Sequence, residues 1–126
     1  MKLEFLPDGS VDCPLVRLYD FDTHQAVCLR LAFDQLANGT VSEVLLHEQE
    51  GIESISGCKL HLRSGKRDVG VVQCSASSFD CILTKKRWAD VVSLTEPFCR
   101  RIEPNTHQWL NEDGPISLLL SPNGMW

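Results

Sequence analysis

The clearest periodic pattern in the chain lies in residues 23–37. Four apolar side chains recur at positions i, i+3, i+4 and i+7 and so share one face of a helix: Leu29, Ala32, Phe33 and Leu36. Asn38 and Gly39 follow directly, and both tolerate the left-handed conformation that ends many helices. The pattern predicts an amphipathic helix over 23–37.

Shorter apolar stretches, separated by turn residues, predict strands in most of the remaining chain. The expected strands are residues 2–6, 14–20, 41–48, 59–63, 68–74, 79–83, 107–110 and 116–121. Very short turns join the three strands between residues 59 and 83. Such turns predict that each of these strands pairs antiparallel with the next one in the chain.

A second helix is expected over residues 85–95, where Thr84 can act as its N-cap and Trp88 lies on its inner side. Pro97 should bend or stop this helix. Three cations would then lie in the first turn, at the unfavourable end of the helix dipole: Lys85, Lys86 and Arg87. The sequence therefore predicts either a later start or another role for these charges.

Strands and helices do not alternate along the chain, which excludes a repeating strand–helix fold. The order instead predicts a single α+β domain over residues 1–126. We expect a mainly antiparallel sheet of about seven or eight strands, with the two helices packed on one face. No internal repeat is recognisable in the sequence.

Composition places the chain among small globular proteins. It has 126 residues, of which 43% are hydrophobic and 23% charged. No apolar stretch approaches the length of a membrane span, and the first residues do not resemble a secretory signal. These features predict a cytoplasmic protein without a membrane partner, in which the six cysteines are free thiols and no cofactor is needed.

Charge is distributed unevenly although the net charge is only −5. Residues 59–87 carry seven basic and two acidic side chains, whereas the rest of the chain carries five basic and fifteen acidic ones. The basic residues form a candidate binding patch: Lys59, Arg63, Lys66, Arg67, Lys85, Lys86 and Arg87. An acidic run over residues 43–53 could face such a patch on a second copy.

The segment LVRLYDFDTH, residues 15–24, ends an expected strand with two carboxylates, Asp20 and Asp22. It resembles the first motif of haloacid dehalogenase-type phosphatases. That resemblance implies Asp20 as the nucleophile that attacks phosphorus, Asp22 as the acid/base and Mg²⁺ between them. The resemblance is confined to this segment, and the expected fold lacks the parallel doubly wound sheet of that family.

The same residues also fit a helix start. Asp22 at the N-cap and Gln25 three residues later form a capping-box pattern, which explains Asp22 without any catalysis. Capping gives Asp20 no role. A third interpretation is a metal site without phosphatase activity that uses Asp20, Asp22 and His24.

Three cysteines in the central strands could approach one another: Cys58, Cys74 and Cys81. Together with His47 or His61 they could hold zinc, although their spacing matches no known zinc motif. The simpler interpretation is that they are buried thiols. No catalytic cysteine is indicated, because no histidine lies in a local motif with any of them.

The sequence favours a module that binds another protein, or a second copy of itself as a possible homodimer, without chemistry of its own. Two alternatives remain open. One is a metal-dependent hydrolase or metal-binding protein that uses Asp20 and Asp22. The other is an accessory protein that binds a polyanion through residues 59–87, although the pI of 5.3 and the lack of aromatic residues in this hairpin disfavour nucleic acid.

Overall fold

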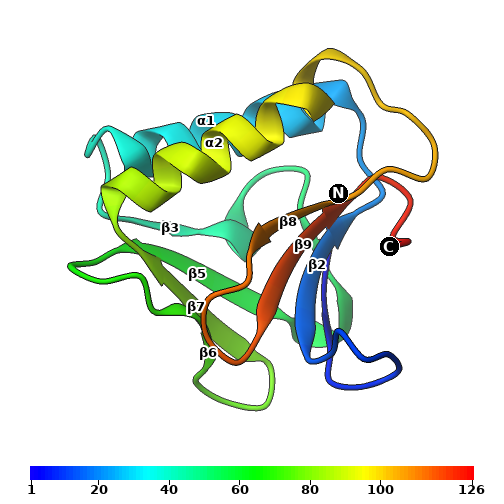
Figure 1. Cartoon of the computed structure of the whole chain (residues 1–126), viewed down its shortest axis with the longest axis horizontal. Coiled ribbons are helices and arrows are strands. Elements are labelled where there is room, and N and C mark those ends of the chain that lie inside the picture. The colour runs from blue at the N-terminus through cyan, green and yellow to red at the C-terminus, as the bar shows by residue number, and fades with distance from the viewer.

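The computed structural model describes all 126 residues and contains two helices that lie side by side over two β-sheets (Figure 1). The strands are β1 Lys2–Leu6, β2 Leu15–Tyr19, β3 Glu43–Leu45, β4 Glu53–Ser54, β5 Lys59–Ser64, β6 Gly70–Gln73, β7 Ser78–Leu83, β8 Gln108–Asn111 and β9 Ser117–Ser121. The helices are α1 Thr23–Ala37 and α2 Lys85–Arg100, and two short 3-10 turns are η1 Leu46–Glu48 and η2 Ile55–Gly57.

Both sheets are mixed. One has five strands in the order β4-β1-β2-β9-β8, and the other has four in the order β3-β5-β7-β6. Three pairs are parallel, namely β1 with β4, β2 with β9 and β5 with β7. The fold is α+β with two helices, but the expected single, mainly antiparallel sheet of seven or eight strands is wrong.

The error lies in the pairing of β5, β6 and β7. The short turn between β6 and β7 does form an antiparallel pair. However, β6 is not the neighbour of β5 in the sheet. Strand β7 lies between β5 and β6 and pairs with both of them. As a result β7 runs parallel to β5, from Lys59 opposite Ser78 to Ser64 opposite Leu83. Connection length alone did not reveal this inserted strand.

The two halves of the chain share one topology. Apart from the two-residue strand β4, which lies between β3 and β5, the first half runs β1, β2, α1, β3, β5 and the second half runs β6, β7, α2, β8, β9. In each half the first two strands pair antiparallel and so do the last two. The last strand of each half then pairs parallel with the second strand of the other half. The two halves are therefore topologically equivalent and exchange their last strands, an arrangement that we call the internal duplication.

The two helices support this equivalence through their buried positions. Both begin after an N-cap, Asp22 in α1 and Thr84 in α2. Buried side chains lie 4, 7, 11 and 14 residues after each cap, namely Ala26, Leu29, Phe33 and Leu36 in α1 and Trp88, Val91, Thr95 and Phe98 in α2. The expectation of no internal repeat is corrected at the level of topology, because the halves share spacing and not residue types.

One hydrophobic core extends between the helices and both sheets. Phe33 of α1 stacks on Trp88 of α2 with their ring centroids 5.7 Å apart, and both side chains are fully buried. The indole N–H of Trp88 donates a hydrogen bond to the carbonyl of Arg63, so its one polar group is satisfied. Phe5 of β1 packs on Phe79 of β7 with centroids 4.4 Å apart and joins the two sheets.

Helix α2 ends later than predicted, and its position beside α1 accounts for a cation at its start. It continues through Pro97 to Arg100 instead of ending at residue 95. The helices are antiparallel, so the start of α2 lies beside the end of α1 (Figure 1). The Lys85 ammonium lies so close to Gly39 that a Cβ there would come within 2.8 Å of it. Lys85 thus lies at the negative end of the α1 dipole.

Neither helix combines the length and the apolar character that are needed to cross a bilayer.

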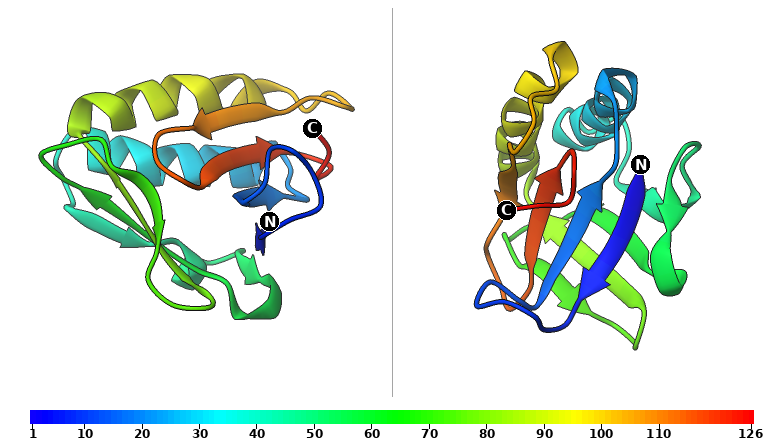
Figure 2. Two further views of the ribbon diagram at one scale, coloured as in Figure 1. Left: turned by 60° about the horizontal axis from the view of Figure 1, so that its bottom comes forward. Right: turned by 90° about the vertical axis from the view of Figure 1, so that its right-hand side faces the viewer.

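The two sheets also meet at a second place, below the helices (Figure 2). There a single β-bridge joins Val71 of β6 to Ile116, just before β9. Gly70 has a φ of 85°, and a Cβ at this position would overlap the carbonyl oxygen of Asp113. Only glycine permits this close approach.

We predict that Gly70→Ala destabilises the protein far more than Gly57→Ala. Both glycines have a left-handed φ, which costs an alanine about 1–2 kcal/mol, but only Gly70 faces backbone where the Cβ would lie. The extra loss in the free energy of unfolding should reach about 2 kcal/mol or more, measured by urea denaturation. Equal losses would mean that the turn before β9 does not pack on Gly70.

Candidate functional site

Asp22 is a helix cap, as the capping pattern predicted. Its Oδ1 accepts a hydrogen bond of 2.8 Å from the backbone N–H of Gln25. The Gln25 side-chain oxygen in turn accepts from the backbone N–H of Asp22 at 3.1 Å. This reciprocal capping box satisfies two amides at the start of α1 and engages the Asp22 carboxylate.

Asp20 belongs to the turn between β2 and α1. It has a left-handed φ of 56°, and its N–H donates to the carbonyl of Pro122 at 2.9 Å. Its carboxylate lies 3.3 Å from the Lys2 ammonium, and this hydrogen bond raises the pKa of Lys2. The Asp20 side chain is 66% exposed, so its ion pair with Lys2 lies at the surface. Aspartate adopts the left-handed φ of this turn more readily than most other residues.

His24 completes the proposed metal set but makes a different contact. It is exposed on α1, and its Nε2 lies 3.9 Å from the Sγ of Cys28 one turn later. No group of three or more His, Cys, Asp or Glu side chains is arranged to hold a metal ion. The fold also lacks the repeated strand–helix units of the phosphatases that the segment resembles.

The seven-residue basic patch is divided in the folded protein. Arg63 lies 3.1 Å from Asp80 on the neighbouring strand. Arg87 forms an ion pair with Asp113. Lys59 begins β5 and is therefore at the opposite end of that strand from the β5–β6 loop. Two of the seven charges are thus paired within the fold, and a third lies apart.

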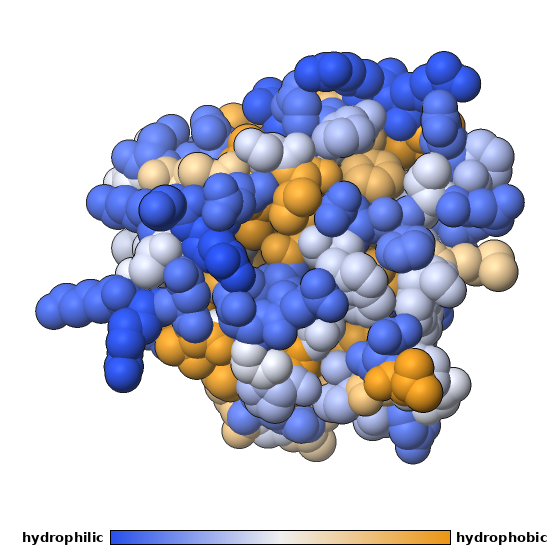
Figure 3. Space-filling model, viewed as in Figure 1, coloured by the Kyte–Doolittle hydropathy of each residue, from blue (hydrophilic) through white to orange (hydrophobic).

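Four basic side chains remain together at one end of the molecule: Lys66, Arg67, Lys85 and Lys86. All four are exposed, on the β5–β6 loop and at the start of α2. Hydrophilic side chains gather there in the space-filling view (Figure 3). We call these four residues the basic cluster.

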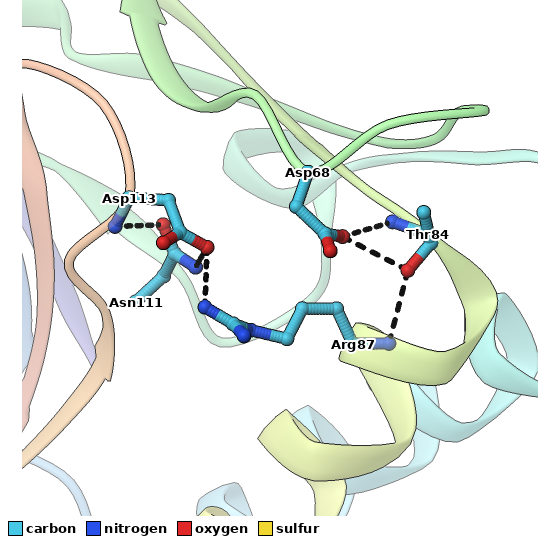
Figure 4. Close-up of polar contacts among 5 residues, drawn as sticks. All are labelled: Asp68, Thr84, Arg87, Asn111 and Asp113. Atoms are coloured by element: carbon cyan, nitrogen blue, oxygen red, sulfur yellow. Dashed lines mark hydrogen bonds and ion pairs between the residues drawn. The ribbon is translucent and has the colours of Figure 1, made fainter.

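A polar network holds the β5–β6 loop against α2 (Figure 4). The backbone N–H and the hydroxyl of Thr84 donate to the Asp68 carboxylate at 2.8 and 2.9 Å. Hydrogen bonding from the Thr84 amide is the main cause that lowers the pKa of Asp68, and the nearby Arg87 and Lys86 charges assist. No local pattern in the sequence indicated this role for Asp68, because the contact joins a loop to the start of a helix that lies further along the chain.

The same network reaches the turn before β9. Asn111 is buried, and its side-chain NH₂ donates to the Asp113 carboxylate at 3.1 Å, while its Oδ1 accepts from the Asp113 N–H. Arg87 binds the same carboxylate from α2. The hydrogen bonds and the ion pair run between these groups, so the network is an internal brace that joins the two sheets and α2.

The three central cysteines are not brought together as a metal site. Cys58 and Cys81 are buried, and burial raises their thiol pKa values to about 11 and about 12. Cys74 is exposed beyond the end of β6. All six cysteines are free thiols. High pKa values keep the two buried thiols protonated and unreactive near neutral pH.

The two histidines proposed as zinc partners have other contacts. His47 accepts a hydrogen bond from the backbone N–H of Leu60 at its Nδ1, 3.2 Å away, and so supports the start of β5. His61 lies on the outer face of the four-stranded sheet between two carboxylates. Its ring nitrogens are 3.2 Å from Glu43 and 3.7 Å from Asp80. These contacts form a charge row across three adjacent strands.

A groove beside α1 is the feature that the sequence did not reveal. It has a volume of about 480 Å³ and runs between α1 and the connection from β3 to β5. The α1 wall is formed by His24, Gln25, Cys28, Leu29, Leu31 and Ala32. The opposite wall is formed by Met1, Leu46, Gln49, Glu50, Gly51 and Ile52. Most of these side chains are apolar, so the groove can receive apolar groups of a ligand.

The outer surface of α1 next to the groove is also apolar. Leu31 is 56% exposed, Val27 is 41% exposed and Cys28 is exposed between them. These residues lie opposite the buried stripe of the helix, where a solvated helix normally carries polar side chains. This surface could have been recognised in the sequence from apolar residues on the side of the predicted helix that should face water. We call Val27, Cys28 and Leu31 the outer stripe of α1.

We predict that Asp22→Ala lowers the free energy of unfolding by about 1 kcal/mol, whereas Asp22→Asn is nearly neutral. Asparagine can accept the same hydrogen bond from Gln25, so the cap survives without the charge. Urea denaturation of the three proteins at neutral pH measures the difference. A loss for Asp22→Asn as large as that for Asp22→Ala would show that the carboxylate acts through its charge.

Asp68 should make stability depend on pH in the acidic range. Because its pKa is lower in the folded than in the unfolded chain, its stabilising effect is present above the ordinary value of about 4 and is lost as the pH falls through the folded value. We predict that wild type is more stable than Asp68→Asn at pH 7 and that this difference shrinks below about pH 4.

Urea denaturation between neutral and strongly acidic pH measures that difference. Asp8→Asn is the control, because the Asp8 side chain is exposed and is not part of this network. A wild-type advantage that persisted unchanged in acid would contradict the assigned role of Asp68.

Comparison with known proteins adds no functional information. No protein-family model, curated protein or solved structure is significantly similar to the chain. The function therefore has to be argued from the surfaces themselves, and the groove with the outer stripe of α1 is the strongest candidate.

Proposed function

We propose that this chain is a non-catalytic module that binds another protein through α1. The observation that carries the proposal is the outer stripe, with Leu31 56% exposed beside an apolar groove of about 480 Å³. Exposed apolar side chains next to a concave apolar surface are typical of protein-binding sites. Burying them in a complex removes apolar area from water and favours association.

The polar groups of the chain support a binding role over a catalytic one. Asp22 caps a helix, Asp20 pairs with Lys2, and Asp113 is engaged by Arg87 and by a buried asparagine. Each carboxylate thus has a structural partner. In addition, no group of three or more His, Cys, Asp or Glu side chains around Asp20 and Asp22 is arranged to hold the metal that such a hydrolase would use.

A second copy of the chain is the other occupant that the charge distribution favours. The basic cluster is exposed at one end, and the acidic residues of the β3–β5 connection are exposed elsewhere. Contact between two different surfaces is head-to-tail, and such contacts form rings or open chains instead of a closed dimer. The basic cluster could also bind a polyanion, but no exposed aromatic side chain lies on its loop to add stacking.

We predict that a photo-crosslinking residue in place of Leu31 forms adducts with a partner protein in the cells that produce this chain. The same residue in place of Ser93, on the exposed face of α2, is the matched control and should form few. The purified partner, identified by mass spectrometry, should bind the chain. Leu31→Asp should weaken that binding at least about tenfold, and Ser93→Asp should leave it unchanged.

Adducts that form equally from positions 31 and 93 would contradict the proposal. Light scattering after size exclusion, across a salt series, distinguishes the two occupants. Salt-sensitive growth beyond a dimer would identify a second copy bound head-to-tail. A monomer at every salt concentration would exclude self-association and leave another protein as the partner.

A further inference from the structure

The internal duplication provides a comparison within one molecule. Because α1 and α2 occupy equivalent places in the two halves, positions at the same distance from the N-cap can be compared directly. The exposed positions of α1 are His24, Val27, Cys28 and Leu31, and their equivalents in α2 are Lys86, Ala89, Asp90 and Ser93. All eight are exposed, but only the α1 set includes large apolar side chains, namely Val27 and Leu31. The fold itself therefore does not require an apolar outer face.

The segment that forms the second wall of the groove is likewise missing from the second half. In the first half the connection between the last two strands covers residues 46–58 and includes η1, β4 and η2. In the second half the equivalent connection covers only residues 112–116. The longer connection forms the second wall of the groove and is held by the N-terminal amine, which donates to the Gly51 carbonyl at 2.9 Å. Both departures from the duplication thus fall on the same surface.

The exposed side chains of α1 follow the spacing i, i+3, i+4 and i+7. This spacing forms a seam along the helix, which is the geometry by which one helix packs against another. The adjacent groove gives room for the side chains of a second helix. A helix that docks in a groove presents apolar anchors with this same spacing.

The charged residues around the groove indicate which charged side chains a partner should carry beside its apolar side chains. Glu50 is the one carboxylate among the lining side chains of the groove, and the one cation among the lining residues is the N-terminal amine of Met1, which is engaged by the Gly51 carbonyl. Glu48 does not line the groove, but it is exposed in η1 two residues before Glu50. Two copies docked through this surface would bring these carboxylates together, which disfavours a symmetric dimer. Lysine or arginine side chains on the partner would complement them.

We propose that α1 and the groove bind an amphipathic helix of another protein, with an apolar seam and basic flanks. The inference rests on the proposed function and adds the chemistry of the partner to it. The helix lies along the outer stripe with its apolar side chains in the groove. Its basic residues face Glu48 and Glu50 on the β3–β5 connection.

The test uses a displayed library of helical peptides of about 16 residues, roughly four turns. Leucine is fixed at the four seam positions, and the flanking positions vary among Lys, Arg, Glu, Asp and Gln. The full chain in reducing buffer selects the binders. We expect Lys and Arg to exceed Glu and Asp at the flanks, and synthetic copies of the binders to bind the chain in fluorescence anisotropy.

Five variants locate the binding. Leu31→Asp and Val27→Asp should each weaken binding at least about tenfold, and their matched controls on α2, Ser93→Asp and Ala89→Asp, should change it by less than about twofold. Glu50→Lys should weaken the binding of basic peptides about threefold to fivefold and strengthen the binding of acidic ones. Circular dichroism checks that each variant is folded.

The outcomes separate this inference from the proposed function. Binders that depend on Leu31 but carry acidic or neutral flanks would overturn the basic partner and leave protein binding at α1 intact. No retained peptide, or equal losses for Leu31→Asp and Ser93→Asp, would overturn docking of a helix at this surface. A native dimer that Leu31→Asp dissociates would replace the proposed partner with a second copy.

Discussion

The exchange of strands between the two halves determines how both sheets are built. At the centre of each sheet, a strand of one half pairs parallel with a strand of the other: β2 with β9, and β5 with β7. Neither half can complete its sheet alone, so both halves contribute to one core. The same exchange brings α1 and α2 together, where Phe33 and Trp88 stack. Ring stacking between the helices therefore stabilises a pairing that the strands impose.

Function is best sought where the duplication is broken. The network of Asp68, Thr84, Arg87, Asn111 and Asp113 braces the junction of the two sheets through contacts among its own members. On the other side, the long β3–β5 connection forms a groove that the second half does not have. The exposed apolar stripe of α1 lies on this groove and has no counterpart on α2. An exposed apolar surface carries a cost in water, which a bound partner removes.

Local signals in the sequence predicted the elements well and their pairing poorly. Helix α1 has the bounds that its apolar period and its Asn38–Gly39 stop indicated, and Asp22 caps it. The period of a strand, in contrast, says which face is buried but not which strand is the neighbour. The insertion of β7 between β5 and β6 joins residues that are distant in sequence, so short turns favoured the wrong, sequential pairing. The duplication was hidden because only the spacing of buried positions is shared.

The candidate sites divide in the same way. Features that depend on near neighbours could be predicted from the sequence: the capping box of Asp22 and Gln25, the amphipathic period of α1 and the uneven charge. Which charges have partners depends instead on how distant segments pack. It paired Arg63 with Asp80 and Arg87 with Asp113, and it separated Lys59 from the basic cluster. It also set the β3–β5 connection beside α1 to form the groove. Caps and periods arise from backbone hydrogen bonds within a few residues, whereas a groove or an ion pair between strands exists only once distant segments have packed together.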